Sequence, residues 1–158
     1  MTKGMEKRSG GFSLLELVIV VSIIGIIAAI AIPRFSRATA GASDAALTGD
    51  LAVMRNAIDM FAAEHGGTFP ALATIVAQLT TYTDVAGTAN ASKTTTYIYG
   101  PYLRQVPKLP VGAKKGQSGI DDEAGTAIGW IYTAATGDIQ ASTTDLELDA
   151  AGTKYNEY

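Results

Sequence analysis

Near the start of the chain, a short basic stretch leads into a glycine–phenylalanine junction and one carboxylate set among aliphatic residues. The junction is Gly11-Phe12 and the carboxylate is Glu16. An acidic side chain deep in a membrane helix costs roughly 2–3 kcal/mol, so an ionisable residue in such a segment is a candidate functional residue. It needs a partner, because removing one member of a buried ion pair typically costs roughly 3–5 kcal/mol.

The segment that contains this carboxylate is long enough to cross a bilayer. Its 21 residues from Phe12 to Ile32 carry polar side chains only at Ser13, Glu16 and Ser22, and Pro33 follows. At a rise of 1.5 Å per residue, a helix of this length spans about 30 Å, the thickness of the hydrocarbon core.

Basic residues before the apolar segment favour an N-terminus in the cytoplasm and an exported C-terminal part. Lys3, Lys7 and Arg8 precede it, although Arg34 and Arg37 lie just beyond it. An ordinary secretory signal cut after Ala31, where small residues occur, is one interpretation. A plain single-span anchor is another, and Glu16 argues against both.

The order Gly11-Phe12-Ser13-Leu14-Leu15-Glu16, followed by an aliphatic helix with Gly25 and Pro33, resembles the class III signal of type IV pilins and type II secretion pseudopilins. The resemblance implies that a prepilin peptidase removes residues 1–11. It cuts between Gly11 and Phe12 and methylates the new amine of Phe12. The apolar helix then stays in the mature protein.

The same resemblance implies roles inside that helix. Glu16, one helical turn after Phe12, pairs with the amino terminus of a neighbouring subunit during assembly. Its alternative is to extend to the cytoplasmic interface. Ser22 can bond to a carbonyl one turn earlier. Gly25 and Pro33 mark a segment that can melt and stretch, although close packing at Gly25 and a simple kink at Pro33 explain them too.

Beyond Pro33, the pattern predicts that the helix continues to His65, giving one helix from Phe12 onward of about 80 Å. The stop is Gly66-Gly67 with Pro70 beyond. An apolar stripe at spacings of four and three indicates the face that packs on a head domain, and it comprises Leu47, Leu51, Met54, Ile58 and Phe61. We expect His65 to interact with the helix dipole or with water.

The predicted fold is α+β, a pilin fold in which a long N-terminal helix packs against a small antiparallel sheet. Its parts are residues 1–11, 12–33, 34–66 and 67–158. In the head we expect a short helix over residues 71–79, loops over 80–93 and 112–125, and an extended connector over 102–110. We expect a strand over residues 95–99 and a hairpin of 128–132 with 138–141. Trp130, the only tryptophan, is expected in the core.

Alternating acidic and apolar residues at 145–149 predict a strand with Leu146 and Leu148 on one face. The sharper interpretation is calcium, because clustered carboxylates suit a hard cation. Asp145, Glu147 and Asp149 are the candidates. The resemblance adds that major pseudopilins carry calcium in their C-terminal loops. The chain has no cysteine, so no disulfide can do that work.

Charge and motifs limit the function. Residues 1–11 have a net charge of +2, which leaves −5 on the remainder and argues against nucleic acid as a partner. No nucleophile–base pair or phosphate loop is present, so we expect no enzyme and no catalytic residue. The resemblance predicts a structural subunit of a filament assembled from the bacterial inner membrane, with a periplasmic C-terminal domain. Its partners are copies of itself, the prepilin peptidase, minor pilin-like subunits and an assembly platform.

Within that class, a major type II secretion pseudopilin is favoured, because Glu16 is present and cysteine is absent. A cysteine-free type IV pilin for adhesion or motility is the alternative. From another class, the rival is a secreted binding protein released by cleavage after Ala31.

Overall fold

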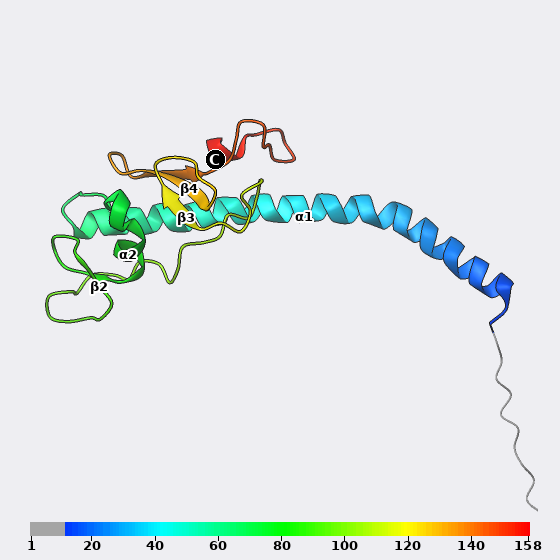
Figure 1. Ribbon diagram of the computed structural model, residues 1–158, viewed down its shortest axis with the longest axis horizontal. Coiled ribbons are helices and arrows are strands. Elements are labelled where there is room, and N and C mark those ends of the chain that lie inside the picture. The colour runs from blue at the N-terminus through cyan, green and yellow to red at the C-terminus, as the bar shows by residue number, and fades with distance from the viewer. Residues whose placement is uncertain (1–11) are drawn as a thin grey trace, which may run out of the picture. The chain divides into compact units, whose positions relative to one another are not determined.

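The computed structural model describes residues 12–158, so the predicted leader and Gly11 lie outside the described part (Figure 1). The chain divides into two compact units, with the boundary between Ala38 and Thr39. The elements are α1 (Leu14–Glu64), η1 (Leu72–Thr74), α2 (Ile75–Thr80), β1 (Tyr82–Thr83), β2 (Ala89–Asn90), β3 (Gly119–Asp121), β4 (Ile128–Thr133), β5 (Asp138–Ala141) and η2 (Tyr155–Glu157). The predicted α+β class is confirmed.

Helix α1 begins and ends within two residues of the predicted positions. At its C-terminal end Gly66 has a φ of 66°, which a residue with a side chain rarely adopts. The Gly67 N–H then donates to the Ala62 carbonyl at 2.8 Å, the six-to-one bond of a Schellman motif. The paired glycines therefore end the helix by satisfying carbonyl groups that would otherwise lack partners.

The predicted apolar stripe of α1 forms the centre of the head-domain core. All five of its side chains are at most 2% exposed, and burying each contributes roughly 1.5–3 kcal/mol. They pack with buried residues of α2, the 102–111 connector and the sheet, which are Ile75, Leu79, Leu103, Leu109, Val111, Trp130, Tyr132, Ile139 and Ala141. In Figure 1, β3 and β4 lie beside the C-terminal half of α1.

The predicted hairpin is confirmed as β4 and β5, paired antiparallel with Tyr132 opposite Ile139. Tyr132 and Trp130, which is also buried as predicted, face the core from alternate positions of β4. Their polar atoms are satisfied, because the Trp130 Nε1–H donates to the Pro107 carbonyl at 2.9 Å. The Tyr132 hydroxyl likewise donates to the Pro70 carbonyl at 2.9 Å.

The expectation of an entirely antiparallel sheet is wrong, because β3 pairs parallel with β4. Residues 112–125, predicted as loop, contain this third strand. Parallel neighbours usually need a connection of a dozen or more residues. Here β3 has only three residues, so the short segment 122–127 suffices to return the chain to the start of β4.

Two further predictions in the head need correction. Residues 95–99 form no strand beyond one bridge between Tyr99 and Thr83. The Thr94 hydroxyl accepts hydrogen bonds from the N–H groups of residues 96 and 97, and this local turn competes with strand pairing. Conversely, the predicted loop 80–93 contains β1 and β2, which pair antiparallel. The short helix is confirmed as η1 and α2.

The predicted strand over residues 145–149 is also wrong. Leu146 is 90% exposed and Leu148 is 48% exposed, so the expected apolar face is not buried. Leu148 makes a single bridge with Lys154. Because the aliphatic side chains find no core here, alternation of residue type does not produce a strand.

His65, expected to interact with the helix dipole or with water, is held by protein groups. Its ring is buried and stacks on Phe61 with 3.9 Å between ring centroids. Its nitrogens lie 2.7 Å from the Phe61 carbonyl and 2.9 Å from the Asp84 carbonyl. His65 therefore connects the end of α1 to the segment after β1.

Candidate processing and assembly site

The first turn of α1 places the predicted assembly residue at a defined helix position. Ser13 directly precedes the first helical residue, and Glu16 is the third residue of the helix. The Ser13 N–H donates to the Glu16 carboxylate at 3.4 Å, and the Leu17 N–H donates to the Ser13 carbonyl at 3.2 Å. This is the glutamate half of a capping box, in which the third helical residue satisfies the N–H of the cap residue.

Capping of the helix by Glu16 was not predicted from the sequence, although Ser13 and Glu16 have the Ser-x-x-Glu spacing of a capping box. A carboxylate in the first helical turn is also stabilised by the positive end of the helix dipole. Among residues 12–158, no basic side chain forms an ion pair with Glu16. The carboxylate is therefore held by its own backbone and remains open to a cation from elsewhere.

Around Glu16, the aliphatic side chains of α1 receive little cover from their own chain. Exposure of the large apolar residues from Leu14 to Ile32 ranges from 46% to 80%. This helix is long and apolar enough to cross a membrane. Roughly 25 cal/mol is gained for each Å² of apolar surface removed from water. The segment is accordingly favoured wherever lipid or another protein covers it.

The remaining residues singled out in this helix have mild local effects. The Ser22 hydroxyl donates to the Val18 carbonyl at 2.7 Å, as predicted. A Cβ added at Gly25 would meet no atom within 4 Å, so the single chain leaves that surface open. The helix continues through Pro33, where the ring nitrogen has no hydrogen to donate. Melting of this segment stays a prediction.

The three carboxylates predicted as calcium ligands do not converge on one metal site in the described residues. Both oxygens of the Asp145, Glu147 and Asp149 carboxylates lie within hydrogen-bonding or ion-pairing distance of donors of the chain. Within residues 12–158, no three acidic or histidine side chains converge as metal ligands. Calcium takes six to eight oxygen ligands at about 2.3–2.6 Å. As they stand, these residues do not fit that requirement.

Their donors lower the pKa of each carboxyl group. The Thr144 N–H lowers the pKa of Glu147, followed by the Ala113 N–H. The Tyr158 hydroxyl lowers the pKa of Asp149. The Asn156 side-chain amide lowers the pKa of Asp145. In each case a hydrogen bond to the ionised form favours ionisation.

Comparison with known proteins agrees with the N-terminal pattern. A family described as "Prokaryotic N-terminal methylation motif" matches residues 7–32. The type II secretion system core protein G of Aeromonas hydrophila is 27% identical over 137 residues, which cover 77% of this chain and 90% of that protein. The type IV major fimbrial protein FimA of Dichelobacter nodosus is 44% identical over 55 residues, covering 35% of each chain. No solved structure matches the chain.

These similarities confirm the resemblance to type IV pilins and type II secretion pseudopilins that was predicted from Gly11 to Glu16. They indicate a pilus-like structural subunit that carries a methylation motif, and residues 12–158 contain one helix long and apolar enough to cross a membrane. Both relatives are named as secretion or fimbrial proteins and neither as an enzyme.

Proposed function

We propose that the chain is the major pseudopilin of a type II secretion system, which polymerises from the inner membrane to drive protein export. The observation that carries this proposal is the share of each relative's length that matches this chain. Likeness to core protein G extends over 90% of that protein, whereas likeness to FimA covers 35% of FimA. The first therefore includes most of a head domain and the second does not.

Processing of the precursor is the first step of this function. The peptidase cuts between Gly11 and Phe12, and Phe12 becomes the methylated first residue of the mature chain. The methylation motif at residues 7–32 supports this step. The mass of the mature protein tests it directly. A chain that begins at N-methyl-Phe12 is expected, and a chain that begins at Ile32 would instead establish the secreted binding protein.

Assembly then uses the carboxylate of Glu16. In a filament or a membrane, the apolar segment is removed from water, and a neighbouring subunit's amino group supplies the cation that Glu16 lacks among residues 12–158. An ion pair in such surroundings depends on both partners, because a single buried charge is costly. The open surface at Gly25 and the proline at position 33 are proposed to permit close packing and stretching of the same helix.

Two substitutions of Glu16 separate charge pairing from helix capping. Glu16→Gln keeps a side chain that can cap the helix, but it removes the charge. We expect Glu16→Gln and Glu16→Ala each to reduce filament yield more than tenfold, since a loss of about 3–5 kcal/mol exceeds the 1.4 kcal/mol of one decade. Ser22→Ala, a polar change in the same segment, is the matched control and retains wild-type yield.

Filament yield is measured by pelleting sheared filaments and immunoblotting, with membrane levels of the subunit as the reference. Wild-type yield from Glu16→Gln alone would assign the residue to capping. Wild-type yield from both variants would remove Glu16 from assembly altogether.

We further propose that the N-terminus is cytoplasmic and the head periplasmic, given the basic residues Lys3, Lys7 and Arg8. The partners are other copies of the chain, minor pilin-like subunits and an inner-membrane assembly platform.

A cysteine-free type IV pilin is the second candidate, favoured by the local identity of 44% with FimA. Deletion of the gene distinguishes the two. Loss of exported proteins indicates the secretion role, and loss of surface pili with normal export indicates the pilin.

A further inference from the structure

Residues 144–158, here called the C-terminal clasp, follow the last strand and contribute few aliphatic side chains to the core. Leu146 and Leu148 are both exposed. No cysteine is available to close the segment. Its position must therefore depend on the hydrogen bonds, ion pairs and tyrosines that it contains.

A small hairpin forms the centre of the clasp. The Asp149 N–H donates to the Thr153 carbonyl at 2.9 Å, and the Tyr155 N–H donates to the Glu147 carbonyl at 3.2 Å. The Asp149 carboxylate accepts the N–H groups of Ala151 and Thr153, each at 2.8 Å. An aspartate that bonds to the backbone two and four residues ahead stabilises a tight turn.

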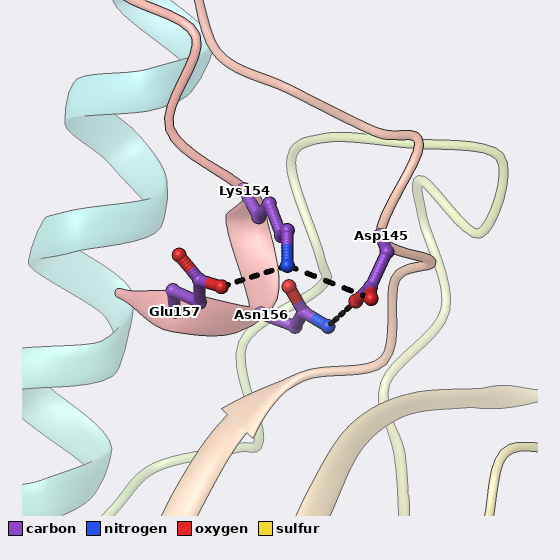
Figure 2. A network of polar contacts seen from close by, with 4 residues as sticks. All are labelled: Asp145, Lys154, Asn156 and Glu157. Carbon is purple, nitrogen blue, oxygen red and sulfur yellow. Dashed lines mark hydrogen bonds and ion pairs between the residues drawn. The ribbon is translucent and has the colours of Figure 1, made fainter.

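Lys154 lies on the returning arm of this hairpin. Its side chain contacts Asp145, which precedes the hairpin, and Glu157, which follows it. Its Nζ lies 2.9 Å from Glu157 Oε1 and 3.5 Å from Asp145 Oδ2. The Asn156 amide donates to the other Asp145 oxygen at 2.9 Å. Figure 2 shows the ammonium between the two carboxylates, with Asn156 beside it. One cation thus connects the start of the clasp, the hairpin and η2.

The clasp also bonds to helix α1 and to β5. The Tyr155 hydroxyl donates to Asp44 Oδ1 at 2.8 Å. Arg55 Nη2 donates to the Tyr158 carbonyl at 2.5 Å and to the Ile139 carbonyl at 3.3 Å. The rings of Tyr155 and Tyr158 pack against the core cluster. These contacts fasten the clasp to the folded head domain.

We propose that the Lys154 ammonium is the internal cation that closes this segment, so that the head domain keeps its C-terminal clasp without calcium. An ammonium has three donors and can bridge two carboxylates. Both oxygens of each of the Asp145, Glu147 and Asp149 carboxylates are already engaged by protein donors, so none can bind a divalent ion without losing a hydrogen bond or an ion pair. The ammonium also repels a second cation from the same place.

Charge arithmetic supports the same conclusion. The clasp holds four acidic residues and Lys154 as its one basic residue, a net charge of −3. Replacing Lys154 with a neutral residue leaves Asp145 and Glu157 without a counter-charge. The hydrogen bonds of Asp149 and Glu147 can still form, but the contact between the two ends of the clasp is weakened, so the hairpin that this contact supports opens more often.

Hydrogen exchange of the full chain in detergent tests the proposal at the residues concerned. Lys154→Met keeps the aliphatic stem and removes the charge. We expect it to speed exchange of the Thr153 and Tyr155 amides roughly 2–5-fold, the range set by an exposed ion pair. Lys115→Met is the matched control, because Lys115 is exposed and its side chain forms no hydrogen bond or ion pair within the described residues. Lys154→Arg keeps the charge and the wild-type exchange rates.

Calcium is the second arm of the test. Exchange of the wild-type clasp and the melting temperature of the chain are expected to be the same in millimolar CaCl2 and in excess EDTA. Slower exchange or a higher melting temperature of the wild type in calcium would overturn the proposal. Equal exchange in Lys154→Met and Lys115→Met would overturn it as well. Neither readout involves filament assembly, so the result is independent of the proposed secretion role.

Discussion

Isoleucine side chains differ in solvent exposure between the two parts of helix α1. Ile24 is 59% exposed, whereas Ile58 is 0% exposed. Both isoleucines lie inside the same continuous helix, so secondary structure does not separate them. The difference is cover. Ile58 packs in the head core, and more than half of Ile24 is left uncovered by the described residues. The C-terminal part of the helix is covered by the head domain, and the apolar segment leaves its side chains exposed.

The largest expected effect separates these two regions by the same substitution. Ile58→Ala should destabilise the head by about 2–5 kcal/mol, because it removes buried methyl groups and leaves a cavity. Ile24→Ala is the control, with no measurable change in head unfolding. Denaturant titration of the detergent-solubilised chain, followed by Trp130 fluorescence, reports both. Equal losses from the two variants would show that the apolar segment contributes to the folded head.

A smaller effect tests how completely the head satisfies its own polar groups. Tyr132→Phe leaves the Pro70 carbonyl without the donor that it has at 2.9 Å. We expect a loss of about 1–2 kcal/mol, since an unpartnered buried acceptor loses its hydrogen bond without regaining water. Tyr97→Phe is the control, because the Tyr97 hydroxyl makes no hydrogen bond within the described residues. Thermal melting distinguishes the pair, and equal melting temperatures would mean that water reaches Pro70.

The smallest effect concerns acid. The pKa of Glu147 is lowered by the Thr144 and Ala113 N–H groups. A lowered pKa in the folded state means that this stabilisation is present above the ordinary value of 4.5 and is lost as the pH falls through the folded-state value below it.

We therefore expect the head to lose stability on acidification below about pH 4.5, and Glu147→Gln to lose less over that interval, by about 1–3 °C in melting temperature. Glu123→Gln, in the exposed segment 122–127, should follow the wild type. An identical acid response in Glu147→Gln would show that this carboxylate does not hold the clasp to Ala113.

Features encoded by neighbouring residues were predictable. The stripe from Leu47 to Phe61 repeats at helical spacing, and Gly66-Gly67 supplies the left-handed conformation that ends the helix. Two strand-like runs, 128–132 and 138–141, separated by a turn that ends at Gly137, predicted β4 and β5. In each case the periodicity or the turn chemistry lies within one segment, so no distant contact was needed to recognise it.

Features that depend on distant contacts were not predictable. Residues 119–121 carry no strand signal of their own and become β3 because β4 lies alongside. Residues 145–149 carry a strand signal and form none, since the Asp149 turn and the Lys154 bridge hold them elsewhere. Burial of His65 could not be predicted, because two of its partners, the Thr83 hydroxyl and the Asp84 carbonyl, come from a later segment of the chain.

The functional segment divides in the same manner. Its apolar length, the junction at Gly11-Phe12 and the carboxylate four residues later are properties of residue order, and they identified the kind of subunit without any fold. Tertiary structure decided how the acidic C-terminal residues are used. Several donors that engage them, such as Ala113 and Asn156, lie far from their carboxylates in the sequence and come close only when the head has folded.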